Sequence, residues 1–222
     1  MPSVGSQAEE TRGRLVEAAT REFAQHGIHA ASLLEITRQA GQRNRGAVHY
    51  HFGSREGMLA AVLEQHVDLL AARETELLAR ARAREGDLAA AVEAFVRPSV
   101  ELAERGWTGR AYLVVLAELV EDDPAGVPPE VVAVLERMGG YEAVGMLEER
   151  MPAMPEALRS ERISLALAFL LRAIADRARA GDRPTSSRPQ LPTEPFLQNL
   201  VTMVAAMLTA PVPGTHPDDT AG

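Results

Sequence analysis

Apolar residues recur at helical spacing along almost the whole chain, and this feature restricts the fold more than any other. Over residues 9–26 they follow the i, i+3, i+4, i+8 spacing of a single helix face, at Leu15, Ala18, Ala19 and Phe23. Hydrophobic residues make up 46% of the 222 residues but aromatic residues only 4%. Alanine and leucine favour helices, whereas the aromatic residues that favour strands are scarce. We therefore expect an all-α fold.

Glycines and capping residues divide the N-terminal quarter into three short helices. Gly27 stands where a residue in the left-handed conformation ends the first helix. Ser32 and Glu35 have the spacing of a capping box, which opens a second helix that ends near Gly41. A third short helix is predicted over residues 45–50.

The remainder of the chain predicts a larger helical bundle. A fourth helix is expected to start at a Ser54 cap and to continue towards Arg84. Pro98 is expected to kink or split the next helix, and the pair Gly139 and Gly140 weakens a later one. The later helices are predicted over residues 88–105, 107–120, from 130 onwards, 156–181 and 195–209.

Charge is distributed unevenly along the chain. Residues 1–55 contain seven arginines and five glutamates, a net charge of +2, whereas the remaining 167 residues carry −10. Because only the N-terminal part is basic, we expect it alone to contact a polyanion. The predicted organisation is a disordered tail over 1–8, a three-helix domain over 9–53, a helical bundle over 54–209 and a disordered tail over 210–222.

Several classes of protein are excluded by simple observations. The chain contains no cysteine, which excludes disulfides, thiolate nucleophiles and zinc bound by cysteine. The first twelve residues, MPSVGSQAEETR, lack the apolar core of a signal peptide. The longest apolar run, Ile163–Leu171, is far too short to cross a membrane. We expect a cytoplasmic protein with no membrane partner.

The histidines do not form the patterns of a metal site or an enzyme. His49 and His51 are two residues apart, so their side chains point to different sides of a helix. A di-iron carboxylate site requires a glutamate three residues before a histidine, and no histidine of this chain has one. There is also no lysine, no G-x-S-x-G motif and no P-loop. We predict no metal, no cofactor and no catalytic residues.

The segment AGQRNRGAVHYHFGSREGML, residues 40–59, concentrates arginine, histidine and a tyrosine ring. A helix, a tight turn and a short second helix present a recognition helix to the major groove of DNA. The helix that starts at Ser32 would then brace it and contact the DNA backbone. Arginine can pair with guanine and asparagine with adenine, and the start of the fourth helix favours an anion. The segment therefore predicts a DNA-binding surface.

Residues 11–63 resemble the DNA-binding domain of the tetracycline-repressor (TetR) family of bacterial transcription regulators. The matching runs are LVEAATREFAQHG, SLLEITRQAG and VHYHFGSREGML. This chain departs from the family in having His49 in place of a tyrosine, Arg55 in place of a lysine, and a QRNRG turn that is one residue longer. The resemblance implies that Val48 and Phe52 belong to the domain core. It also implies DNA contacts by Arg43, Asn44, Arg45, His49, Tyr50, His51 and Arg55.

Four large side chains of the C-terminal bundle are candidates for the lining of a ligand cavity: Phe95, Trp107, Tyr112 and Met138. Methionine and aromatic residues at helical spacing more often belong to an ordinary core, and that interpretation stays open for each of them. The resemblance implies a small-molecule pocket in this domain. We expect this pocket beside Pro98 and beside Gly139 and Gly140, where the helices should be distorted.

The last two long helices, over residues 156–181 and 195–209, are apolar on more than one face. Leu165–Leu171 is an uninterrupted apolar run, and Phe196 and Met203 widen the stripe of the second helix. A helix that buries a single face needs a narrower stripe. The surplus favours contact between two copies across a two-fold axis, like the four-helix dimer interface of TetR-like proteins. The alternative is a helix at the centre of the monomer core.

The predicted function is that of a homodimeric transcriptional regulator, and a repressor in particular. Its two N-terminal domains would bind successive major grooves of a near-palindromic operator in double-stranded DNA, about 34 Å apart. An unknown small-molecule effector would release the operator by binding a conformation in which that spacing is wrong. Two alternatives stay open: a ligand-independent DNA-binding regulator or activator, and a helical ligand carrier or enzyme.

Overall fold

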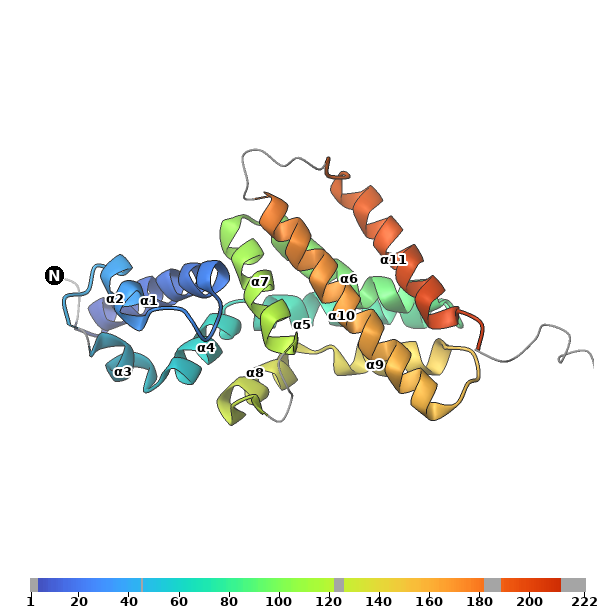
Figure 1. The fold of residues 1–222 in the computed structure, drawn as a ribbon, viewed down its shortest axis with the longest axis horizontal. Coiled ribbons are helices and arrows are strands. Elements are labelled where there is room, and N and C mark those ends of the chain that lie inside the picture. The colour runs from blue at the N-terminus through green and yellow to red at the C-terminus, as the bar shows by residue number, and fades with distance from the viewer. Residues whose placement is uncertain (1–3, 45, 122–125, 182–188, 213–222) are drawn as a thin grey trace, which may run out of the picture.

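The computed structural model describes residues 4–44, 46–121, 126–181 and 189–212, and every element within these ranges is a helix (Figure 1). We call α1–α4, which lie at one end of the molecule, the head, and α5–α11 the body. The all-α fold expected from the sequence is confirmed. In chain order the helices are α1 (Val4–His26), α2 (Leu33–Gln39), α3 (Ala47–Phe52), α4 (Arg55–Glu64), α5 (Val67–Arg82), α6 (Leu88–Glu104), α7 (Trp107–Glu121), α8 (Pro129–Met138), α9 (Tyr141–Arg150), α10 (Glu156–Gly181) and α11 (Thr193–Thr209).

The head is built around the apolar face of α1. Leu15 and Phe23 on this face are completely buried, and Ile36 of α2 and Val48 of α3 are buried with them. The helix ends at Gly27, whose φ of 86° is accessible to glycine without strain, as the sequence predicts.

The first helix begins earlier than predicted. The amphipathic pattern indicates a start near Glu9, but α1 begins at Val4, so residues 4–8 do not form the disordered tail expected over 1–8. No proline separates these residues from the amphipathic segment, and a helix can therefore extend into them. Residues 1–3 lie outside the described residues.

The predicted long fourth helix is divided into α4 and α5 at Gln65 and His66. The Gln65 side chain donates a hydrogen bond to Thr20 Oγ1 of α1 (2.9 Å), and the His66 ring packs edge-on against Tyr112 of α7, with centroids 4.9 Å apart. The prediction of a single helix was wrong because these contacts with distant helices fix the break, while the apolar spacing continues through it.

The central helix of the body is α6, which contacts α5, α7, α9, α10 and α11. Asp87 caps it, since Asp87 Oδ1 accepts a hydrogen bond from the Ala90 N–H (2.9 Å). Pro98 is buried inside α6, and the helix continues past it, so the predicted split does not occur. A proline costs about 3 kcal/mol in a helix interior. Burial of α6 against its neighbours outweighs this cost.

Gly139 and Gly140 separate α8 from α9, where the sequence predicts one weakened helix. Both have positive φ angles, 94° and 91°. The Gly140 N–H donates to Glu74 Oε1 of α5 (2.8 Å), and a Cβ atom at position 139 would approach that carboxylate to 3.1 Å. Glu74 is only 8% exposed. A buried carboxylate thus fixes the point at which the chain turns.

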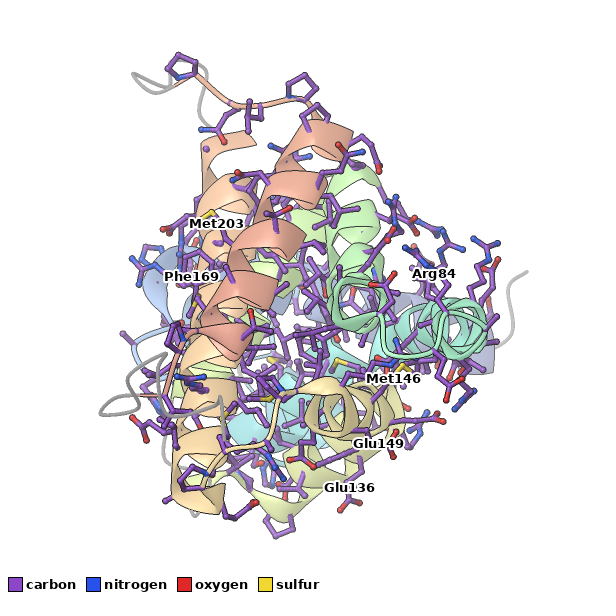
Figure 2. All side chains as sticks on the ribbon, turned by 90° about the vertical axis from the view of Figure 1, so that its right-hand side faces the viewer. Arg84, Glu136, Met146, Glu149, Phe169 and Met203 are labelled. Carbon is purple, nitrogen blue, oxygen red and sulfur yellow. The ribbon has the colours of Figure 1, made fainter. Side chains whose placement is uncertain are left out.

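The last two helices cover one side of the body. α10 packs on α7, and α11 packs on α6 and α10 (Figure 1). Their outer faces keep large apolar side chains at the surface: Leu165 is 55% exposed and Met203 is 44% exposed. Figure 2 shows Phe169 of α10 and Met203 of α11 at the same edge of the body. Within the described ranges, no helix combines the length and apolar character needed to span a membrane.

Candidate nucleic-acid interface

The second helix of the head starts at the predicted cap. Ser32 Oγ accepts a hydrogen bond from the Glu35 N–H (3.2 Å). The Glu35 carboxylate binds the Arg38 guanidinium at 2.8 and 2.6 Å, and these hydrogen bonds lower the pKa of Glu35 to about 2. The Ser32 N–H donates instead to Glu22 Oε1 of α1 (3.3 Å). One half of the predicted capping box is therefore present, and a buried residue of α1 takes the place of the other half.

The turn before the third helix contains two of the predicted DNA contacts. Asn44 Oδ1 accepts a hydrogen bond from the Gly46 N–H (2.9 Å), which closes the turn directly before α3. The helix begins at Ala47, two residues later than predicted. Arg43 and Asn44 lie exposed in the turn before it. Arg45 lies outside the described residues.

The third helix has a buried side and an exposed side. Val48 is buried, whereas Tyr50 is 81% exposed and His49 is also exposed. His49 Nδ1–H donates to the Gly53 carbonyl oxygen (2.5 Å), which orients its ring. His51 is half-buried, with its ring 5.0 Å from that of Tyr50. Among the residues that the structure describes, no three His, Asp or Glu side chains are grouped to hold a metal ion.

The start of the fourth helix is fixed by a cap and by a contact inside the head. Ser54 Oγ accepts a hydrogen bond from the Gly57 N–H (3.0 Å). Arg55, predicted to contact DNA, is half-buried and donates from Nη1 to the Ile28 carbonyl oxygen (2.9 Å). Phe52 is half-buried and packs against the core. Arg55 therefore positions the loop that follows α1, whatever else it contacts.

A second contact to the loop after α1 comes from the body. Nothing in the sequence indicates it. Glu118 Oε1 of α7 accepts a hydrogen bond from the Ile28 N–H (2.7 Å). A Cβ atom at Gly27 would lie 2.9 Å from that oxygen, so glycine also provides the space for it. Ile28 and Glu118 are 90 residues apart, and no local pattern could have indicated their contact. The main-chain carbonyl of Ile28 is thus held by Arg55 of the head, and its N–H by Glu118 of the body.

Two of the predicted ligand residues lie in contact in the body. Tyr112 is completely buried, and its hydroxyl donates to Met138 Sδ (3.6 Å). Burial raises the pKa of the Tyr112 phenol. The Tyr112 ring also contacts that of His66, whose pKa is lowered by burial and by the nearby charge of Arg105. Tyr112 packs as a core residue, as the plainer interpretation of the sequence predicts.

The other two predicted ligand residues lie apart from each other. Phe95 is half-buried and approaches Gly140, where its Cε2 atom is 3.6 Å from the position of an added Cβ atom. It therefore lies near the break between α8 and α9, as Met138 does. Trp107 is elsewhere, at the junction of head and body, where the Arg21 guanidinium lies 4.4 Å from the centre of its ring. The structure does not bring all four residues into one site.

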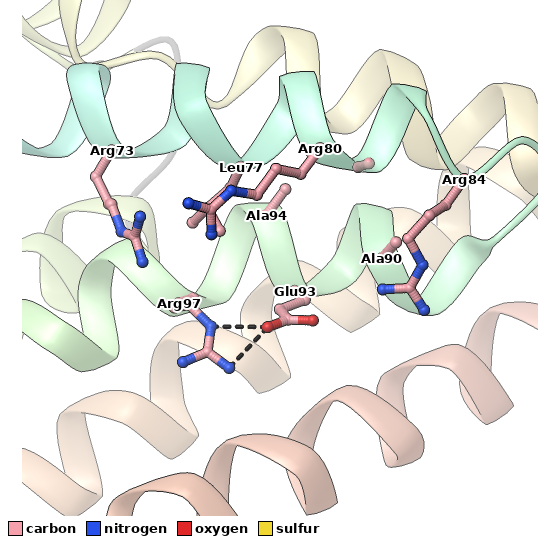
Figure 3. A pocket seen from close by; sticks show the side chains of 9 residues that line it. Arg73, Leu77, Arg80, Arg84, Ala90, Glu93, Ala94 and Arg97 are labelled. Atoms are coloured by element: carbon pink, nitrogen blue, oxygen red, sulfur yellow. Dashed lines mark hydrogen bonds and ion pairs between the residues drawn. The ribbon is translucent and has the colours of Figure 1, made fainter.

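A groove of about 310 Å³ between α5 and α6 contains a concentration of arginine (Figure 3). Arg97 Nη2 lies 2.7 Å from Glu93 Oε1, and Arg73 forms two hydrogen bonds of 2.8 Å with Glu101. Arg80 pairs with Glu76, and Arg84 pairs with Asp87. Since each positive charge has a carboxylate partner, we interpret this groove as a surface ion-pair network. The four arginines are Arg73, Arg80, Arg84 and Arg97.

Two family models match the chain, one for each part of the fold. Residues 15–62 match the model described as bacterial regulatory proteins of the tetR family, and residues 93–207 match that of the tetracyclin repressor-like C-terminal domain. The second match alone covers half of the chain. Among curated proteins, the chain is similar to the HTH-type transcriptional activator FasR of Mycolicibacterium smegmatis, with 38% identity over 87 residues. This match spans 39% of each protein, about two fifths of the relative's length.

Solved structures share the fold over almost the full length. The fatty acid degradation regulator FadR from Bacillus halodurans matches 90% of this chain and 95% of its own, with a TM-score of 0.54 and 16% identity. AibR, in complex with isovaleryl coenzyme A and operator DNA, matches 91% of this chain and 100% of its own, with the same TM-score and identity. At this identity the likeness concerns the fold alone. Because both parts of the chain match models of one family, the chain belongs to the tetR family of bacterial regulatory proteins.

Proposed function

We propose that the protein is a sequence-specific DNA-binding transcriptional regulator with no catalytic activity. The observation that carries the proposal is the exposed side of α3. Tyr50 and His49 project from a helix whose other side is anchored by Val48, next to a turn that exposes Arg43 and Asn44. A short anchored helix with polar and aromatic groups on its free side has the form of a recognition helix.

Further DNA contacts of this head are assigned from charge and position. Ser32 is exposed at the start of α2, where a phosphate would be favoured, and His51 follows Tyr50 on α3. Arg55 uses Nη1 to hold Ile28, but a guanidinium has five N–H donors, so it can also reach a phosphate. Arg45 stays a predicted contact. The net charge of +2 in the first 55 residues supports binding by this part of the chain alone.

The test is binding to the DNA upstream of the protein's own gene, measured by fluorescence anisotropy at several salt concentrations. Specific binding should persist at physiological salt and weaken steeply as salt rises. Tyr50→Ala should weaken it by about 1–3 kcal/mol if the ring reads bases. The matched control is Tyr141→Ala, since Tyr141 is 69% exposed on the body. Equal losses in both variants, or no specific binding, would contradict the proposal.

We also propose a homodimer formed through α10 and α11, over about residues 156–181 and 195–209. Its support is the apolar surface that Leu165, Phe169 and Met203 leave on these helices. Leu165→Arg should convert the dimer into a monomer in analytical ultracentrifugation. Leu191→Arg is the control, because Leu191 is 50% exposed but precedes α11. A wild-type chain that sediments as a monomer would exclude this interface.

We propose further that the protein is a repressor. A small-molecule effector would bind the body and release the operator. Met138 and Phe95, near the break between α8 and α9, are its candidate contacts there, and the buried Tyr112 supports Met138 through its hydroxyl. FasR is described as an activator, so an activator of the same fold is the second candidate. A transcription reporter with and without the protein decides between the two signs. Since operator DNA is its target, we propose a cytoplasmic location.

A further inference from the structure

A groove of about 500 Å³ lies between the head and the body, where α1 meets α7 and α10. Small-molecule sites have volumes of about 300–1,000 Å³ and occur preferentially between domains. The apolar part of the lining consists of small side chains beside one large ring, which leaves space that bulkier residues would fill. The lining residues are Arg21, Ala24, Gln25, Trp107, Ala111, Val114 and Arg179.

The charged side chains of this lining are both positive. Arg21 of α1 and Arg179 of α10 contribute guanidinium groups, and the described lining includes no carboxylate. Arg21 Nη2 is 3.7 Å from Glu17, and Arg179 Nη1 is 3.3 Å from Asp176, but both carboxylates are more than half exposed and lie outside the lining. Such exposed pairs are weak, and each guanidinium has five N–H donors.

This arrangement differs from the arginine-rich groove between α5 and α6. There, Glu93 is part of the lining, and Arg73 and Arg97 each form hydrogen bonds with two carboxylates. An anion entering that groove would have to displace acidic partners that are already bound. In the groove between head and body, an anion would meet two cations of different helices and an apolar surface next to them.

We propose that the groove between head and body binds a small organic anion. Its carboxylate would pair with Arg21 and Arg179, and its apolar part would lie on Ala111 and Val114 beside Trp107. The site is distinct from the effector position proposed near the break between α8 and α9. The proposal rests on the proposed function only in one respect, the effect of the bound anion on DNA affinity.

The position of the site gives it a consequence for the head. An anion held by Arg21 and Arg179 connects α1 of the head with α10 of the body. It would add to the connection that Glu118 already makes with Ile28. Occupancy would therefore restrict the orientation of the head relative to the body, and operator affinity should change when the groove is filled.

The test uses Trp107, the single tryptophan of the chain, as the reporter. The full-length protein, without DNA, is titrated with 4-phenylbutyrate while tryptophan fluorescence is recorded, and isothermal calorimetry provides an independent measurement. A saturable change is expected with the carboxylate, and weaker binding with the neutral analogue 4-phenylbutan-1-ol. No saturable signal by either method, or equal binding of the alcohol, would overturn the proposal.

Variants decide whether the signal comes from this groove. Arg179→Gln should weaken binding of the carboxylate about tenfold, because it removes a hydrogen bond between two charged groups. Ala24→Leu should block the groove without changing its charge. Arg80→Gln, in the groove between α5 and α6, is the matched control and should leave the affinity unchanged.

Each remaining result also has a definite meaning. Equal affinity in wild type, Arg179→Gln and Ala24→Leu, with all three correctly folded by circular dichroism, would overturn the proposal. So would a fluorescence change that depends on protein concentration and not on the anion, because it would assign the groove to a second copy of the chain. Since no DNA is present, failure here leaves operator binding standing, and failure of operator binding leaves this site standing.

Discussion

The head and the body each contain a buried glutamate that fixes a loop, but they surround it differently. Glu22 of the head is 4% exposed and accepts hydrogen bonds from the Ser32 N–H (3.3 Å) and the Gln39 side chain (3.2 Å). Glu74 of the body is 8% exposed and accepts one from the Gly140 N–H (2.8 Å), while burial raises its pKa. In the head, the buried glutamate binds two groups that are close to it in the sequence. In the body, it binds a group that is 66 residues away.

The aromatic side chains show the same contrast. Tyr50 of the head is 81% exposed, and Tyr112 of the body is completely buried. A surface side chain contributes little to folding and is available for binding, whereas a buried one contributes mainly to the core. The comparison predicts that substitutions on the exposed side of α3 separate binding from stability more cleanly than substitutions in the body.

The largest effect is expected from a pair of tyrosine variants. Tyr112→Ala should lower the free energy of unfolding by about 3–5 kcal/mol, because it removes a large buried side chain and leaves a cavity. Tyr50→Ala should change it by no more than about 0.5 kcal/mol. Urea unfolding followed by circular dichroism, at one protein concentration, measures both. Comparable losses in the two variants would break the contrast between head and body.

A smaller effect is expected at the contact that joins the two regions. Glu118→Ala should cost about 1–3 kcal/mol of stability, because the Ile28 N–H loses its acceptor. Glu118→Gln keeps an acceptor oxygen and should cost less. Glu136→Ala, at the surface of α8 (Figure 2), is the control. Thermal unfolding of the three variants in parallel gives the ranking, and a loss in Glu136→Ala as large as in Glu118→Ala would refute it.

Helix caps offer a second comparison, in which the residue of the body has one further contact, the ion pair of Asp87 with Arg84. Ser54 caps α4 in the head and Asp87 caps α6 in the body, each with one hydrogen bond to a backbone N–H. Replacement of either by alanine should cost about 1 kcal/mol, and replacement by glycine only a few tenths. Urea midpoints at constant slope provide the measurement. A negligible cost in the head alone would show that α4 is stabilised by the body and not by its cap.

The smallest effects concern pH, and they have opposite signs. The pKa of His66 is lowered by burial, so the stability it contributes is present above its ordinary value of 6.5 and is lost as pH falls below it. The pKa of Glu74 is raised, so its contribution is present at low pH and is lost as pH rises above 4.5. Unfolding of His66→Phe should therefore be less sensitive to acid than that of wild type, and Glu74→Gln should lose less stability with rising pH. Matched stability profiles of the variants and wild type from about pH 4 to 8 would show that neither group titrates as described.

Much of the head could be predicted from the sequence because its determinants are local. Ser32 and Ser54 cap their helices and Gly27 ends α1 as predicted, and each acts within one helical turn of its own position. Val48 is buried, as the resemblance to the TetR family implies, and Tyr50 on the other side of α3 is exposed. The start of α3 was predicted two residues too early, since Asn44 closes the turn through a side-chain contact that propensity does not capture.

The parts that could not be predicted depend on contacts across the fold. The break between α4 and α5 is fixed by Thr20 and Tyr112, which lie on other helices. The candidate ligand residues could not be grouped correctly because Trp107 faces α1 of the head and Tyr112 faces α8 of the body. Their order along α7 contains no information about which neighbour each one meets.

Both contacts to Ile28 use its main-chain atoms: Glu118 of the body accepts a hydrogen bond from the N–H, and Arg55 of the head donates one to the carbonyl oxygen. Main-chain atoms are common to all residues except proline, which lacks the N–H. Evolution can therefore vary the side chain at this position within the limits of packing while the mechanical link between the two halves of the regulator persists. Comparative sequence studies that search for paired changes between residues 28 and 118 would miss it.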